Sequence, residues 1–178
     1  LGVPGFKRGR RYQALEGSPE YFTWYEVESP SVLRSAEYIN CLSNPTPWTK
    51  QIMSGVFLNA SRTVCKRHII AGELFGSIAM TIRLEADASD QDIQETVKAA
   101  YDPARVARIE KWSADEKPGD EAKAEEQIRG PDEKIKICFI LETIREEDAR
   151  IFATELLKQS IRAEIGIYKL LCEYPKLL

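Results

Sequence analysis

The sequence predicts an α+β fold built from two repeats of the split βαβ, or ferredoxin-like, unit. The second half follows the order strand, helix, strand, strand, helix, strand. The first half follows the same order without an opening strand and helix, which indicates an internal repeat. With 178 residues, the chain is long enough for two small domains, expected at 1–71 (the incomplete first repeat) and 72–178.

The first half is expected to hold a hairpin, a helix and a long strand. Residues 6–15 and 21–28 are aromatic-rich runs separated by turn residues, which predicts the hairpin. Ser29 and the proline after it are typical of a helix start, and the helix is expected to end before Pro45. The β-branched and aromatic residues of 52–70 then favour a strand, with a bulge near 59–62.

The second half is expected to hold four strands and two helices. Apolar residues recur at strand spacing in four segments and at helical spacing in two. Ser89 is a typical N-cap residue for the first of these helices, and two aspartates stand in its opening turn. Residues 113–134 carry 8 acidic and 4 basic side chains, which predicts a solvated loop with one helical turn at 121–128. The strands are predicted over 73–85, 106–112, 136–143 and 166–174, and the helices over 89–102 and 146–159.

Charge and composition exclude several classes of protein. The net charge of −3 gives no electrostatic reason for nucleic-acid binding. No run reaches the ~18 apolar residues of a membrane span, and no secretory signal is present, so a cytoplasmic protein without a membrane partner is expected. Four scattered cysteines and a single histidine make a metal site improbable and predict reduced, mostly buried thiols.

Sequence motifs for nucleotide or acyl-transfer chemistry are missing. The chain contains no nucleophile elbow, no glycine-rich dinucleotide fingerprint and no phosphate-binding loop. No cofactor is therefore expected. The basic run at residues 7–11 is interpreted as a solvated strand edge with one inward pair, because strand alternation sends its arginines to both faces.

Two polar and aromatic strand faces are the candidate site. A three-residue loop at 17–19 would place Arg10 opposite Glu26 and Tyr12 opposite Trp24 on one face of the hairpin. In the second half, one face carries Arg108, Glu110 and Trp112 on one strand and Cys138, Ile140 and Glu142 on the next. The opposite face of these strands is apolar and is expected to lie under the helices; it holds Leu74, Ile78, Met80, Ile82, Ile109, Ile137, Phe139 and Leu141.

Three short motifs resemble the dimeric α+β barrel superfamily. They are Val3-Pro4-Gly5-Phe6 before the first strand, Tyr25-Glu26 at the end of the second, and Phe139-Ile140-Leu141-Glu142 in the second copy. This superfamily includes the EthD-like, antibiotic-biosynthesis monooxygenase and stress-responsive barrel families, and the chain looks most like an uncharacterised tandem-repeat branch. The resemblance implies two antiparallel sheets packed as a barrel, with a further strand and helix before Pro4.

The leading hypothesis is a protein that binds a small apolar, aromatic or polyketide-like molecule in an interior pocket. Its expected ligand-binding residues are Arg10, Tyr12, Trp24, Glu26, Arg108, Trp112 and Glu142. The resemblance implies a cofactor-free oxygenase or cyclase, with Glu142, Glu26 and His68 as the candidates for catalysis. The alternative is a non-catalytic structural or oligomerisation module, such as a homodimer, in which an arginine–glutamate pair only balances enclosed charges.

Overall fold

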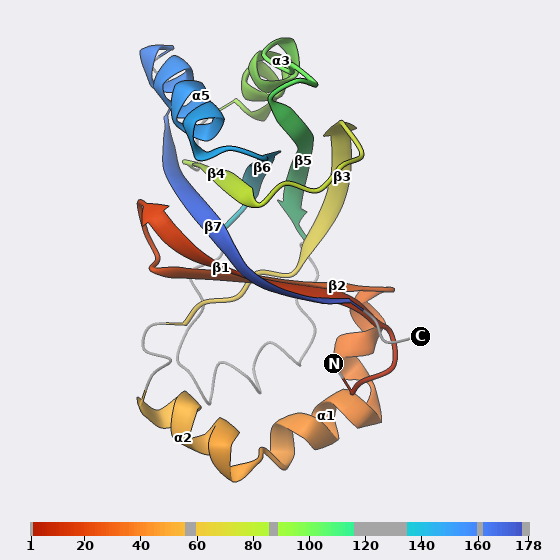
Figure 1. The fold of residues 1–178 in the computed structure, drawn as a ribbon. Coiled ribbons are helices and arrows are strands. Elements are labelled where there is room, and N and C mark those ends of the chain that lie inside the picture. The colour runs from red at the N-terminus through yellow and green to blue at the C-terminus, as the bar shows by residue number, and fades with distance from the viewer. Residues whose placement is uncertain (1, 56–59, 86–88, 116–134, 160–161, 176–178) are drawn as a thin grey trace.

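The computed structural model describes residues 2–55, 60–85, 89–115, 135–159 and 162–175. It is an α+β fold in which seven antiparallel strands form one curled sheet, a half-barrel, in the order β2-β1-β7-β4-β6-β5-β3 (Figure 1). The strands are β1 (Phe6–Glu16), β2 (Tyr21–Val27), β3 (Cys65–Ala71), β4 (Ile78–Leu84), β5 (Val106–Ala114), β6 (Ile137–Thr143) and β7 (Ala163–Pro175).

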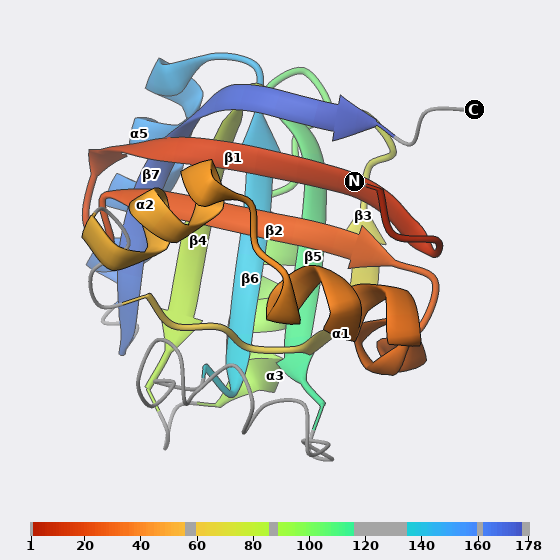
Figure 2. The same ribbon diagram turned by 90° about the horizontal axis from the view of Figure 1, so that it is seen from below.

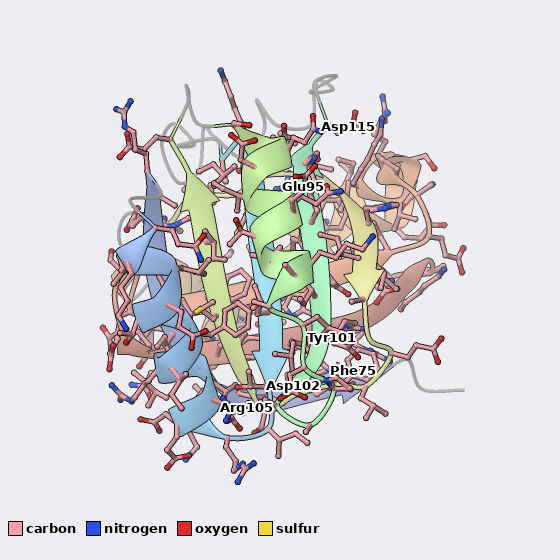
Figure 3. The ribbon with its side chains drawn as sticks, turned by 90° about the horizontal axis from the view of Figure 1, so that it is seen from above. Phe75, Glu95, Tyr101, Asp102, Arg105 and Asp115 are labelled. Atoms are coloured by element: carbon pink, nitrogen blue, oxygen red, sulfur yellow. The ribbon has the colours of Figure 1, made fainter. Side chains whose placement is uncertain are left out.

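The second half has the order of strands and helices that the sequence predicts. Its four strands lie in the order β7-β4-β6-β5, and α3 (Asp90–Ala99) and α5 (Glu146–Lys158) cover their convex face (Figures 1 and 3). The Ser89 hydroxyl accepts a hydrogen bond from the Asp92 amide, so the predicted cap of α3 is confirmed. One core cluster lies between these helices and the sheet, and it includes Ile78, Met80, Ile82, Ile109, Phe139, Leu141, Phe152 and Leu156.

Leu74 is an exception to the predicted apolar face. Strand β4 begins only at Ile78, so Leu74 lies on the connection before it and is exposed. Gly72 and Gly76 fix this connection. Gly72 has a φ of +74°, and a Cβ atom on Gly76 would lie 2.4 Å from the carbonyl oxygen of Thr143. The predicted strand over 73–85 is therefore confirmed only from its sixth residue onward.

The first half does not form a sheet of its own. The hairpin of β1 and β2 pairs with β7 at one edge of the sheet, whereas β3 pairs with β5 at the other edge. Figure 2 shows the hairpin lying across the strands of the second half. The expectation of two separate sheets packed face to face is therefore replaced by a single sheet to which both halves contribute. Strand β1 is an inner strand, so the expected solvated edge at 7–11 is wrong.

The predicted helix after the hairpin is divided in two. Pro30–Arg34 forms a 3-10 helix, and Ser35 rather than Ser29 caps α1 (Ala36–Ser43) by accepting a hydrogen bond from the Tyr38 amide. Ser29 makes no side-chain cap bond. None of the residues of α1 is buried, whereas one face of α5 is buried against the sheet.

The predicted strand over 52–70 is wrong in its first part. Helix α2 (Pro47–Gly55) extends into that range, because Thr46 accepts a hydrogen bond from the Thr49 amide and Pro47 occupies the first turn. Residues 60–64 lie outside regular structure, and only β3 is a strand. Most of the predicted charged loop, including its helical turn at 121–128, lies outside the described residues, as does residue 59 of the predicted bulge.

The hairpin register differs from the prediction by two residues. Arg10 lies opposite Trp24, and Tyr12 lies opposite Phe22. The Ala14 amide bonds to the Glu20 carbonyl, so the connection is longer than the three residues expected. A shift of two residues keeps every side chain on its predicted face, because side chains alternate with a period of two.

No helix among the described residues has both the length and the apolar content needed to cross a membrane.

Candidate functional site

The concave face of the sheet holds a compact group of polar and aromatic side chains, here called the interior cluster. It contains six of the seven predicted ligand-binding residues, with Glu110 added and Glu26 lying beyond it. Strands from both halves of the chain contribute, because the curl of the sheet brings β1 and β2 over β5 and β6 (Figure 2). The interior cluster consists of Arg10, Tyr12, Trp24, Arg108, Glu110, Trp112 and Glu142.

Glu142 is the centre of the interior cluster. Its Oε1 accepts hydrogen bonds from Arg10 Nη1 at 2.9 Å and from Arg108 Nη2 at 3.3 Å. Its Oε2 accepts a 2.8 Å hydrogen bond from the Gly76 amide. The three residues are nearly fully buried, with Arg10 2%, Arg108 3% and Glu142 1% exposed. Each buried charge therefore has a charged partner, as the high cost of an unpaired charge requires.

The predicted pairing of Arg10 with Glu26 is wrong. Arg10 instead bonds Glu142 and, through Nε at 2.8 Å, Glu173 of β7. Glu26 makes a two-bond ion pair with Arg67 of β3, with both N–O distances at 3.0 Å. This pair links the two outer strands of the sheet across its open side. The partners differ from the prediction because the register places Trp24 rather than Glu26 opposite Arg10 on β2, and Glu173 of β7 lies opposite Arg10 on its other side.

Glu110 is the carboxylate of the interior cluster whose hydrogen bonding is incomplete. Its Oε2 accepts a 2.7 Å hydrogen bond from Trp112 Nε1. Its Oε1 lies 3.0 Å from Arg108 Nε, but the geometry gives no hydrogen bond, and both atoms are buried without one. Burial raises the pKa of Glu110, although Trp112, Arg108 and Arg67 act against this shift. Burial therefore favours the protonated form of Glu110 relative to a carboxyl group in water.

Aromatic rings form the walls of the interior cluster. The Trp24 and Trp112 rings meet at a centroid distance of 4.5 Å, and the Tyr12 and Phe22 rings stack at 5.6 Å. Trp24 Nε1 is buried without a well-formed hydrogen bond to any described residue. Burial and the charge of Glu142 raise the pKa of Tyr12 to about 12, so this phenol remains protonated at neutral pH.

Phe75 closes one end of the interior cluster. It lies on the connection between β3 and β4 (Figure 3), and the residue is 43% exposed. The guanidinium carbons of Arg8, Arg10 and Arg108 lie 4.1, 4.1 and 4.0 Å from its ring centroid, which is well within cation–π range. Phe75, Arg8 and Glu173 were not predicted as site residues. Strand alternation places Arg8 on the same face as Arg10, but no local pattern identifies Phe75 or Glu173.

His68 is the remaining predicted candidate for catalysis. His68 is exposed on β3, opposite Lys111. Its neighbour Arg67 forms an ion pair with Glu110 of the interior cluster, and strand alternation places His68 on the other face of the sheet. The structure therefore does not bring His68 to the interior cluster.

Of the four free cysteines only Cys138 is buried, so the expectation of mostly buried thiols is wrong. Burial raises the pKa of Cys138 to about 12 and keeps it a neutral thiol.

A separate surface groove of about 590 Å³ lies beside the interior cluster's strands. It joins the segment after β2 to the outer strand β3 and the end of β5. Serine, proline and charged side chains line it, and Asp115 marks its β5 end (Figure 3). The lining residues are Ser29, Pro30, Ser31, Arg34, Lys66, Ala114 and Asp115.

The charged groups of the interior cluster are balanced in sign. The interior cluster and its edge contain arginines and glutamates in nearly equal number, so the site as a whole carries little net charge. Its distinctive chemistry is a set of guanidinium groups held against aromatic rings at cation–π distance. Among the described residues no group of three or more His, Cys, Asp or Glu side chains is arranged to hold a metal ion.

No known protein-family model, curated protein or solved structure matches this chain.

Proposed function

We propose that this chain binds a small aromatic molecule on the concave face of its sheet and does so without a cofactor. The observation that carries the proposal is the meeting of Arg10, Trp24, Arg108, Trp112 and Glu142 in one cluster drawn from both halves of the chain. Buried carboxylates hold the guanidinium groups in place, so the site is organised before any ligand binds.

A relationship of this fold to the α+β barrels is part of the same proposal. We infer that the chain is a tandem-repeat relative of the α+β barrels, because β3 and the β1–β2 hairpin flank a unit with the order β7-β4-β6-β5. On this interpretation the ligand is a phenolic or polyketide-like compound. An oxygenase or cyclase reaction is a further expectation of the resemblance, with Glu142 as the candidate base.

The test is a thermal-shift and calorimetric screen with phenols, aromatic acids and polyketide-like compounds. A ligand that binds only the folded protein raises its melting temperature. We expect a hit whose affinity falls at least tenfold in Arg108→Met, while Arg105→Met, an exposed arginine on the preceding loop, binds as the wild type does. A broad panel without any shift would contradict the proposal.

A second candidate function is a structural or oligomerisation module. It is favoured by two outer strands, β2 and β3, whose far edges pair with no other strand among the described residues, and by α1, which buries none of its residues. Such edges accept further strands. Cytoplasmic location remains part of either proposal.

The module is tested by measuring molar mass in solution by light scattering. Tyr25 on β2 and Ile69 on β3 are exposed apolar side chains, and a lysine at either position should dissociate an edge-paired dimer. Leu157→Lys, at an equally exposed apolar position on α5, is the matched control. A monomeric wild type, or a dimer that is unchanged by both edge variants, would contradict this function.

A further inference from the structure

Phe75 has an unusual set of neighbours for an exposed phenylalanine. Three guanidinium groups converge on its ring at about 4 Å, from β1 and β5. We define Arg8, Arg10 and Arg108 as the arginine cage. A ring surrounded in this way gains cation–π attraction from each neighbour, and this attraction is stronger where the cations are buried, as Arg10 and Arg108 are.

The arginine cage does not depend on Phe75 for its shape. Glu142 holds Arg10 and Arg108, and Glu173 holds Arg8 at 3.2 Å and Arg10 at 2.8 Å. These carboxylates neutralise the mutual repulsion of the three guanidinium groups. The cage would therefore keep its form if the phenyl ring turned away.

The phenyl ring can leave without a change in the backbone. Gly72 and Gly76 fix the connection on either side, since neither has room for a Cβ atom, and the Gly76 amide is bonded to Glu142. The Phe75 side chain itself is 43% exposed and faces solvent on one side. A rotation about its side-chain torsions alone would open the cage.

Arg108 also has an unused donor. Its Nε is buried and lacks a hydrogen bond with correct geometry, although Glu110 Oε1 lies 3.0 Å away. A ligand with an oxygen substituent on its ring could supply the missing acceptor. Buried donors without a well-formed hydrogen bond are rare in folded proteins, so an acceptor that completed this one would add to ligand binding.

We propose that the arginine cage is the subsite for the aromatic ring of the ligand, and that Phe75 occupies this subsite as an internal competitor. The ligand class is a phenol or hydroxybenzoate, which combines an electron-rich ring with an oxygen acceptor. This inference rests on the proposed binding function. It places the aromatic ring of the ligand at the end of the interior cluster that Phe75 now closes.

The experiment compares binding of 4-hydroxybenzoate and its saturated analogue 4-hydroxycyclohexanecarboxylate by calorimetry. Removal of the competitor in Phe75→Ala should tighten 4-hydroxybenzoate binding roughly tenfold, the equivalent of one cation–π contact of intermediate strength. Leu74→Ala, at an exposed apolar position on the same connection but outside the cage, should bind as the wild type does. The saturated analogue should bind to none of these proteins.

A second readout does not depend on affinity. The Phe75 ring should shift the Nε–Hε NMR signals of the three cage arginines upfield. Phe75→Leu, which keeps an apolar side chain and so protects the fold, should abolish these shifts. Saturating 4-hydroxybenzoate should restore them in the variant.

The outcomes separate this inference from the function on which it rests. Equal affinity of wild type and Phe75→Ala, or arginine signals that do not respond to the ring, would overturn the cage assignment and leave binding on the concave face intact. If no compound of the panel binds the wild type or either alanine variant, both proposals fail.

Discussion

Arg10 and Glu142 lie 132 residues apart in the chain, yet they form a 2.9 Å ion pair in which each side chain is about 1% exposed. The pair connects the hairpin of the first half to β6 of the second half. Because both charges are removed from water, the value of the pair depends on both partners being present. Four predictions follow from this pair and its surroundings.

Removing one partner of this pair should be strongly destabilising. We expect Arg10→Met to lower the free energy of unfolding by on the order of 3 kcal/mol, because Glu142 loses its closest cation. Arg10→Met combined with Glu142→Met should cost less than the sum of the two single changes. Urea unfolding measures all three. Arg8→Met is the control, since Arg8 is partly exposed, and a loss of similar size there would contradict the special role of the buried pair.

Gly76→Ala should destabilise the fold by about 2 kcal/mol. An added Cβ would lie 2.4 Å from the Thr143 carbonyl oxygen and 2.7 Å from its nitrogen, and neither backbone atom can turn aside as a side chain would. Thermal unfolding measures the change. Gly2→Ala is the matched control, because nothing lies within 4 Å of its added Cβ. Equal melting temperatures for the two variants would contradict the close contact.

Glu110 should make the stability of the fold depend on pH. Burial raises its folded-state pKa above the usual value of 4.5, so the folded protein binds its proton more tightly than the unfolded chain does. Stability contributed by this group is therefore present below about pH 4.5 and is lost as the pH rises through the raised pKa. The neutral isostere in Glu110→Gln should gain melting temperature relative to wild type between pH 4 and pH 7.

The control for this pH dependence is Glu95→Gln, which changes an exposed glutamate on α3 (Figure 3). Its melting temperature should follow that of the wild type across the range. If the difference between Glu110→Gln and wild type stayed constant with pH, Glu110 would not be the group responsible.

Tyr12 should make the folded protein less stable at alkaline pH. Burial is the main cause, and together with the charge of Glu142 it raises the pKa of Tyr12 from 10 to about 12. The folded state thus retains a proton that the unfolded chain releases, and stability falls as the pH rises from 10 to 12, by roughly 3 kcal/mol in total. Tyr12→Phe should show a shallower loss of stability over this range, whereas Tyr21→Phe, at an exposed position, should match the wild type. Chemical unfolding at several alkaline pH values measures the slopes, and parallel slopes for all three proteins would rule out Tyr12.

Local patterns predicted the second half well. Strands β5 and β6 and helices α3 and α5 all carry apolar residues at the spacing of their own structure, so each element could be assigned without knowledge of its neighbours. The error at 52–70 had a local cause. Thr46 and Pro47 are a typical helix start, but the β-branched residues further along favoured a strand.

The candidate site was predicted by face but not by partner. Arg10, Tyr12 and Trp24 lie on the concave face as expected, and they remained there despite the register shift because an even shift preserves alternation. Glu173 and Phe75 could not be assigned to the site. Glu173 reaches the site because β7 pairs with β1, and Phe75 reaches it because the curl of the sheet brings the connection after β3 close to β1.

The sequence by itself determined the α+β class, the helical elements of the second half and the faces on which the side chains of β1, β2, β5 and β6 lie. These properties depend on hydrophobic periodicity, capping residues and alternation, all of which act over a few positions. Only the tertiary structure decided that the hairpin joins β7, that Arg10 meets Glu142 rather than Glu26, and that three arginines enclose Phe75. Those contacts join residues far apart in the chain, and they arise from the edge at which each strand pairs and from the curl of one continuous sheet.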